Sequence, residues 1–186
     1  MESNRNASLI VVVAVLALIA AGCGSSGSSS TTTTTSASAT ETWASGVCTS
    51  ITTWQAALKS ATDSVKGNPT KSGLQTAGND AKAATQTLAS DLKGLGKPDT
   101  QAGQQAKDSL DQLSTTLQQN MTTIENTVEG ISGVKGGLTA VPTVTATLAT
   151  METQVKTTFE GLDAKGELKN AFASSSACNS LRSHGS

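Results

Sequence analysis

The chain is poor in the residues that stack ligands, transfer protons or hold metals. Its 186 residues include two Trp, two Phe, one His and no Tyr. Surfaces that bind bases or sugars by stacking need exposed rings, so such platforms are not expected here. The single histidine, His184, lies near the end of a polar tail. No packing would position it there for catalysis, and no cluster of His or Cys surrounds it to make a zinc site.

Charge is also scarce, and it is nearly balanced. The chain has 13 Lys and Arg against 14 Asp and Glu, a net charge of −1. We therefore predict no nucleic-acid partner and no polybasic patch for anionic lipid. Asp108 and Asp111 lie one helical turn apart, as do Glu125 and Glu129, but calcium needs six or more oxygens from a loop or several elements. Both pairs are better interpreted as solvated helix faces, and we predict no metal and no cofactor.

An uncharged hydrophobic run occupies residues 7–21 and is followed by glycine and cysteine. Such a run is typical of the central region of a secretory signal peptide. It is too short, and flanked by the wrong residues, for a stable membrane span. An uncleaved anchor and an ordinary signal peptide are the alternatives that this pattern leaves open.

The end of the run, Ile-Ala-Ala-Gly-Cys at residues 19–23, resembles the lipobox of bacterial lipoproteins. In that family a diacylglycerol is joined to the cysteine sulfur, and a dedicated signal peptidase cuts just before the cysteine. The resemblance implies that residues 1–22 are a signal peptide and that Cys23 is the lipidated first residue of the mature protein. It also implies a lipid anchor on the outer face of the bacterial cytoplasmic membrane, with the membrane as a partner.

Of the three cysteines, Cys48 and Cys178 are left once Cys23 carries lipid. Exported chains reach oxidising compartments, where disulfides form and persist. We therefore predict a disulfide between Cys48 and Cys178. Two free buried thiols that pack as small hydrophobic side chains are the alternative.

Residues 23–41 are predicted to be a flexible, lipid-anchored linker rich in Gly, Ser and Thr. Residues 24–40 contain no apolar side chain larger than alanine, and residues 31–35 are all threonine. Such a tract cannot bury enough surface to offset the entropy lost on ordering.

Residues 42–181 show apolar spacings that predict four helices. The first ends at Gly67-Asn68-Pro69, the second ends near Leu95, and the third starts from an N-cap at Asp99 or Thr100. Residues 132–140 are predicted to be a glycine-rich loop, after which Pro142 opens the fourth helix. Residues 182–186 are predicted to be a disordered tail. The clearest apolar stripes belong to the first and third segments: Ala44, Val47, Ile51, Trp54, Leu58, Ala61, Val65, and Ala102, Ala106, Leu110, Leu113, Leu117, Met121, Ile124, Val128, Ile131.

Four helices with short connections predict an all-α, up-down-up-down four-helix bundle. In that topology Cys48 and Cys178 lie at the membrane-proximal end, and the turns at 67–70 and 132–140 lie at the distal end. Val134, Lys135 and Leu138 at the distal end are candidate partner contacts, because apolar residues on glycine-rich backbone are typical of binding surfaces. The alternative is that Val134 and Leu138 fold back and cap the core.

Two short motifs carry a second resemblance. They are Trp-Ala-Ser-Gly-Val-Cys at residues 43–48 and Gly-Leu-Gly-Lys-Pro at residues 94–98. The domain that contains them resembles uncharacterised secreted lipoproteins of actinobacteria. That resemblance implies a helical fold and a cell-envelope location, and it carries over no functional residue.

These features predict a binding or scaffolding module for another envelope protein or polymer, without catalytic activity. No serine lies in a Gly-x-Ser-x-Gly elbow, and the glycine-rich segment lacks the Lys-Ser/Thr pair of a phosphate loop. A small-ligand carrier that uses the bundle interior is one alternative, but it would need larger side chains around a cavity. An enzyme with an unrecognised site is the other.

Overall fold

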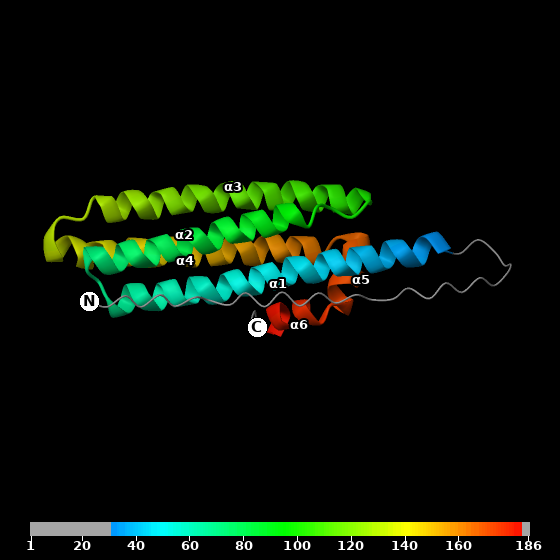
Figure 1. The fold of residues 1–186 in the computed structure, drawn as a ribbon, viewed down its shortest axis with the longest axis horizontal. Helices are drawn as coiled ribbons and strands as arrows, with labels where there is room; N and C mark the ends of the chain where they lie inside the picture. Colours follow the sequence, from blue (N-terminus) through cyan, green and yellow to red (C-terminus); the bar gives the residue numbers. More distant parts are fainter. Residues whose placement is uncertain (1–30, 184–186) are drawn as a thin grey trace, which may run out of the picture.

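The computed structural model describes residues 31–183, and for residues 31–38, Val134 and Ser183 it describes the backbone alone. Within this part of the chain the protein is all helical. The elements are α1 (Thr31–Gly67), α2 (Lys71–Gly94), α3 (Gln101–Glu129), α4 (Gly133–Asp163), α5 (Gly166–Ser174) and α6 (Ser176–Ser183). The four long helices lie side by side along one axis (Figure 1). The two short helices, α5 and α6, are the last elements of the described chain and pack against α1.

Consecutive long helices pack on one another: α1 contacts α2, α2 contacts α3, and α3 contacts α4. Helix α1 also contacts α4, α5 and α6, so the N-terminal and C-terminal parts of the described chain meet. This arrangement gives every long helix at least two neighbours against which to bury an apolar stripe.

The apolar stripes predicted for the first and third segments form the core. In the first stripe all seven residues are buried, and in the third every residue except the half-buried Ala102 is buried. The core also holds one polar pair, in which Nε1 of Trp54 donates a hydrogen bond of 3.2 Å to Oγ1 of Thr85. That bond satisfies the indole N–H, which would otherwise be costly to bury.

The turns before α2 and α3 use the same capping device. Thr70 and Thr100 are the N-caps, and their hydroxyls accept from the backbone N–H of Gly73 and Gly103, at 3.1 and 2.9 Å. A Cβ at Gly73 would lie 2.2 Å from the carbonyl oxygen of Asn68, so only glycine fits there. The predicted stops at 67–69 and 94–98 are therefore real.

Helix α1 begins at Thr31, inside the segment 23–41 that was predicted to be a flexible linker. For residues 31–41 that prediction is wrong. Thr40, Trp43 and Ala44 are buried, so packing holds the helix from about residue 40, and backbone hydrogen bonds extend it towards the N-terminus. Residues 1–30, including the predicted signal peptide, Cys23 and the first part of the linker, lie outside the described residues.

The predicted loop at residues 132–140 is also wrong, because α4 begins at Gly133 and Pro142 lies inside it. The reason is a close approach of two backbones. A Cβ on the buried Gly137 would lie 2.4 Å from the carbonyl oxygen of Pro69. Glycine here lets α4 pack directly against the turn between α1 and α2.

The last predicted helix is divided into α4, α5 and α6. Gly166 has φ +35°, a conformation that favours glycine and breaks the path of α4. Cys178 consequently lies on a separate short helix. For residues 182 and 183 the predicted disordered tail is wrong, because α6 runs to Ser183 and Arg182 pairs with Asp163 at 2.6 Å. His184 lies outside the described residues.

Candidate functional site

The predicted disulfide is present and joins α1 to α6. The sulfurs of Cys48 and Cys178 are 2.02 Å apart, and the Cα atoms are 5.0 Å apart. Both side chains are fully buried. The bond closes a loop of 130 residues, which in the chain-entropy model adds about 5 kcal/mol to stability. That is a large share of what a domain of this size normally has.

The end of the molecule beside this bond holds three of the four aromatic side chains. The ring of Phe172 on α5 meets the edges or faces of Trp43 and Phe159 at centroid distances of 5.8 and 5.5 Å. Nε1 of Trp43 also donates to the carbonyl oxygen of Gly96 at 3.2 Å, which ties α1 to the turn between α2 and α3. The tryptophans are thus core residues, and neither ring is available to an outside ligand.

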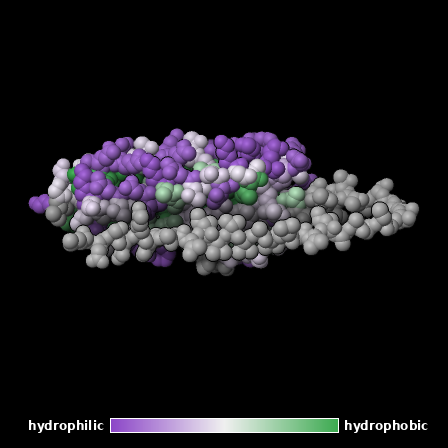
Figure 2. All heavy atoms as spheres, viewed as in Figure 1, coloured by the Kyte–Doolittle hydropathy of each residue, from purple (hydrophilic) through white to green (hydrophobic). Residues whose placement is uncertain are grey.

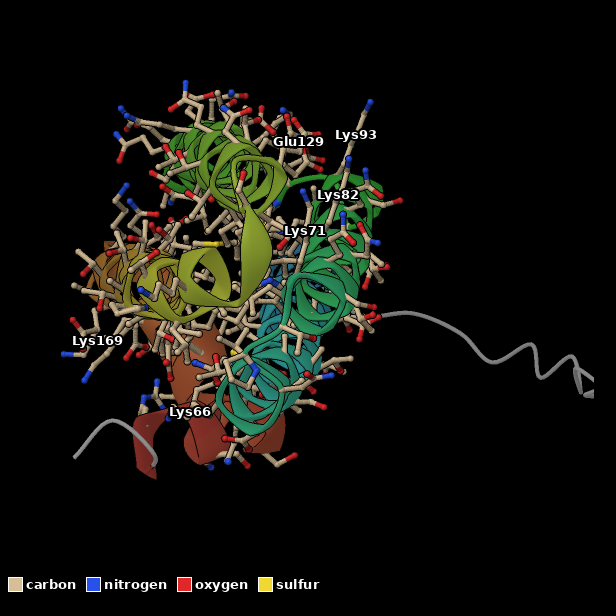
Figure 3. The ribbon with its side chains drawn as sticks, turned by 90° about the vertical axis from the view of Figure 1, so that its left-hand side faces the viewer. Lys66, Lys71, Lys82, Lys93, Glu129 and Lys169 are labelled. Atoms are coloured by element: carbon tan, nitrogen blue, oxygen red, sulfur yellow. A yellow bond between two sulfur atoms is a disulfide. The ribbon has the colours of Figure 1, made fainter. Side chains whose placement is uncertain are left out.

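At the opposite end, Lys71 connects the start of α2 to the segment between α3 and α4. Its Nζ donates to the carbonyl oxygens of Glu129 and Ile131, at 3.1 and 3.0 Å. Lys82, about three helical turns further along α2, pairs with Glu125 on α3 at 2.6 Å. Both lysines lie between these two helices in the end-on view (Figure 3).

The candidate contact residues lie near this end, on the first turns of α4. Lys135 is exposed, and Leu138 is the large hydrophobic side chain that stands out in the described part, with 57% of its surface exposed. Leu138 therefore does not cap the core, and it lies on helical rather than loop backbone. The side chain of Val134 lies outside the description.

The paired carboxylates serve as ordinary surface partners. Asp108 accepts from Gln104 at 3.0 Å, and Asp111 pairs with Lys107 in an i,i+4 ion pair. Within residues 31–183 the structure contains no group of three or more His, Cys, Asp or Glu side chains placed to hold a metal ion. Asp108, Asp111 and Glu125 therefore each have a cationic or amide partner of their own.

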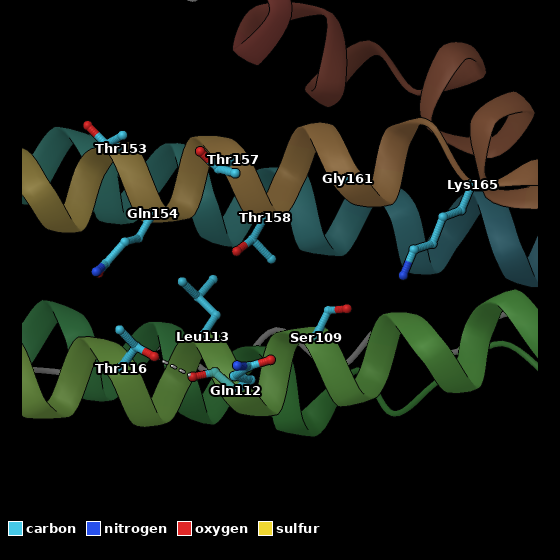
Figure 4. Close-up of a pocket in the computed structure, with 10 residues that line it drawn as sticks. All are labelled: Ser109, Gln112, Leu113, Thr116, Thr153, Gln154, Thr157, Thr158, Gly161 and Lys165. Atoms are coloured by element: carbon cyan, nitrogen blue, oxygen red, sulfur yellow. Dashed lines mark hydrogen bonds between the residues drawn. The ribbon is translucent and has the colours of Figure 1, made fainter.

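The grooves of the surface follow the seams between helices. One groove of about 430 Å³ lies between α3 and α4 and is lined by Ser109, Gln112, Leu113, Thr116, Thr153, Gln154, Thr157, Thr158, Gly161 and Lys165 (Figure 4). The core residue Leu113 forms its floor, while hydroxyls and amides form its walls. This lining offers hydrogen bonds and one cation, but no acid–base pair and no activated nucleophile.

On the face shown in Figure 2, the coloured surface is largely hydrophilic, with small apolar areas. Among the described residues, no helix combines the length and the hydrophobicity that crossing a membrane would require. No protein-family model, curated protein or solved structure matches the chain. The two candidate features of the molecule are a buried disulfide near one end and an exposed leucine near the other.

Proposed function

We propose that the chain is a lipid-anchored binding or scaffolding module on the outer face of a bacterial cytoplasmic membrane. The observation that carries the proposal is the division of its three cysteines. Cys48 and Cys178 are bonded to each other, so Cys23 is the one cysteine outside the bridge. It is also the residue that ends the lipobox-like sequence.

The disulfide supports export independently of the signal sequence. Disulfides are rare in the cytosol, because cytosolic reductants break them, and they are common in exported proteins. A fully buried bond between residues 130 positions apart is a structural element of the domain rather than a transient modification. An exported, bridged domain is what the lipobox resemblance would require.

We further propose that residues 42–181 form an up-down-up-down four-helix bundle. The order of helix contacts supports it, since each long helix packs on the next and α1 also contacts α4. The hydrogen bond from Trp43 to Gly96 and those from Lys71 to Glu129 and Ile131 support the same connectivity at the two ends. The bundle displays Leu138 at the end opposite the disulfide.

The anchor is tested by replacing Cys23 with serine. The Cys23→Ser chain should take up no labelled palmitate and should keep its signal peptide, which mass spectrometry detects as the unprocessed mass. A Cys48→Ser/Cys178→Ser chain is the matched control and should still be labelled and cleaved. Palmitate label in the Cys23→Ser chain, or its absence from both chains, would refute lipidation at Cys23.

Partner binding is tested at Leu138 against a buried leucine of the same helix. Leu138→Ser should leave the melting temperature within about 1–2 °C of wild type, because the side chain is already 57% exposed. It should also abolish a crosslinked species formed on intact cells. Leu148→Ser, at a position 2% exposed, should lower the melting temperature by several degrees. If Leu138→Ser retains the crosslinked species, the partner binds elsewhere.

A further inference from the structure

Helix α6 is too short and too polar to hold its position by packing alone. It has eight residues, Ser-Ala-Cys-Asn-Ser-Leu-Arg-Ser. Cys178 is its one buried hydrophobic residue, while Ala177 and Leu181 are only partly buried. Isolated helices of this length are unstable in water. Its position therefore depends on the disulfide, with the Arg182–Asp163 ion pair as a second connection.

The surface under α6 belongs to the apolar stripe of α1. Ala44, Val47 and Ile51 are buried, and α6 packs on α1. Beyond α6 a groove of about 330 Å³ continues between α1 and α4, with Ile51 and Phe159 among its lining residues and Leu181 of α6 at its edge. The lining of this groove also includes the charged residues Lys59, Glu152 and Lys156. Without α6, the part of α1 beneath it would lose its cover.

We propose that α6 is a strap that closes over α1 when the Cys48–Cys178 bond forms, after export. The timing rests on the export proposed above, whereas the mechanical role of the bond does not. Before oxidation the four long helices are in place, α6 is undocked, and the part of α1 beneath it is exposed. After oxidation α6 covers that part of α1.

The closing step is a thiol–disulfide exchange with a disulfide-bonded protein oxidant. One cysteine thiolate attacks the oxidant and forms a mixed disulfide, and one oxidant thiol leaves. The second cysteine then attacks the mixed disulfide, so that the Cys48–Cys178 bond forms and the second oxidant thiol leaves. Two protein thiols are oxidised and one oxidant disulfide is reduced, with no net change in bound protons.

Two further observations make the closure directional. The ion pair between Arg182 and Asp163, with atoms 2.6 Å apart, holds α6 to the C-terminal end of α4 and so keeps Cys178 near Cys48. Once the bond exists, both cysteines are fully buried. An attacking thiolate needs access to a sulfur, so the closed bond resists reductants that would reduce an exposed one.

The strap is tested by amide hydrogen exchange of the full chain, extracted in detergent and read by mass spectrometry. The oxidised wild type is compared with Cys48→Ala/Cys178→Ala, and Arg182→Gln with its disulfide intact is the control. In the double variant, peptides covering residues 176–183 should lose their protection and exchange at least about tenfold faster, while peptides from α2 and α3 should remain protected because the long helices stay folded. In the control, residues 176–183 should stay protected.

Two results would overturn the strap. Continued protection of residues 176–183 without the disulfide would show that packing holds α6. Loss of protection throughout the four long helices together with residues 176–183 would show that α6 is not released separately from the rest of the domain. Neither result bears on lipidation, because the palmitate experiment at Cys23 is read separately.

Discussion

Replacing Gly73 by alanine should destabilise the protein, although alanine is the better helix former. Gly73 is the third residue of α2, and its backbone N–H is held by the hydroxyl of Thr70 at 3.1 Å. An alanine Cβ would lie 2.2 Å from the carbonyl oxygen of Asn68 and 2.5 Å from the side-chain Cγ of Asn68. Those atoms cannot simply turn away, because the oxygen belongs to the backbone and the next residue is Pro69, whose φ is fixed.

The size of the effect follows from three contributions. Helix propensity favours alanine by up to about 1 kcal/mol. Relieving the overlap costs about 1–3 kcal/mol, as other forced insertions into packed sites do. Moving residue 73 away also weakens the Thr70 cap, which is worth about 1 kcal/mol. The net loss is about 1–3 kcal/mol, or about 3–10 °C in melting temperature for a domain of this size.

Gly161→Ala is the matched control, since it makes the same change in an exposed position of α4. A Cβ there meets no atom within 4 Å, so only the propensity gain of up to about 1 kcal/mol is left. Urea unfolding followed by far-ultraviolet circular dichroism should therefore give shifts of opposite sign for the two variants. Stability gained by both would refute the close approach of Gly73 to Asn68.

Two further predictions concern single interactions. Thr85→Val should cost about 1–3 kcal/mol in urea unfolding, because it leaves the buried indole N–H of Trp54 without an acceptor. Thr150→Val, at an exposed threonine, should cost little. The pKa of Asp63 lies below its ordinary value of 3.8 because Nζ of Lys59 donates to it at 2.7 Å. Its stabilising contribution is therefore present above about pH 4 and lost as the pH falls through the lowered pKa. Lys59→Met should raise that pKa in an NMR titration.

The long helices could be predicted because their apolar residues recur at regular helical spacing. In the third segment the spacing of three and four residues holds from Ala106 to Ile131, and every residue of that series is buried. The turns could also be predicted, because Gly67 with Pro69 and Gly96 with Pro98 end the helices that precede them. Burial and turn chemistry both act through neighbouring residues, so the sequence displays them directly.

The start of α4 could not be predicted, because glycine occurs both in loops and at helical positions where two backbones pack closely. A cluster of glycines at residues 133–137 is typical of a loop when the chain is considered one segment at a time. Gly137 is nevertheless helical. Glycine is required there because a Cβ would overlap the carbonyl oxygen of Pro69, which lies in the turn between α1 and α2. The exposure of Leu138 follows from that helix, since its neighbours Gly137 and Ala140 take the buried positions.

The C-terminal segment is organised by a different kind of constraint from the long helices. Its apolar spacing breaks at Gly166, and α6 contains too few apolar residues to indicate a packed face. The number of cysteines predicted the bond, yet not that Cys178 would lie on a helix of its own. Apolar periodicity thus positions the four long helices, while a covalent bond positions α6. Loss of that bond should accordingly release α6 before it disturbs the helices that periodicity holds together.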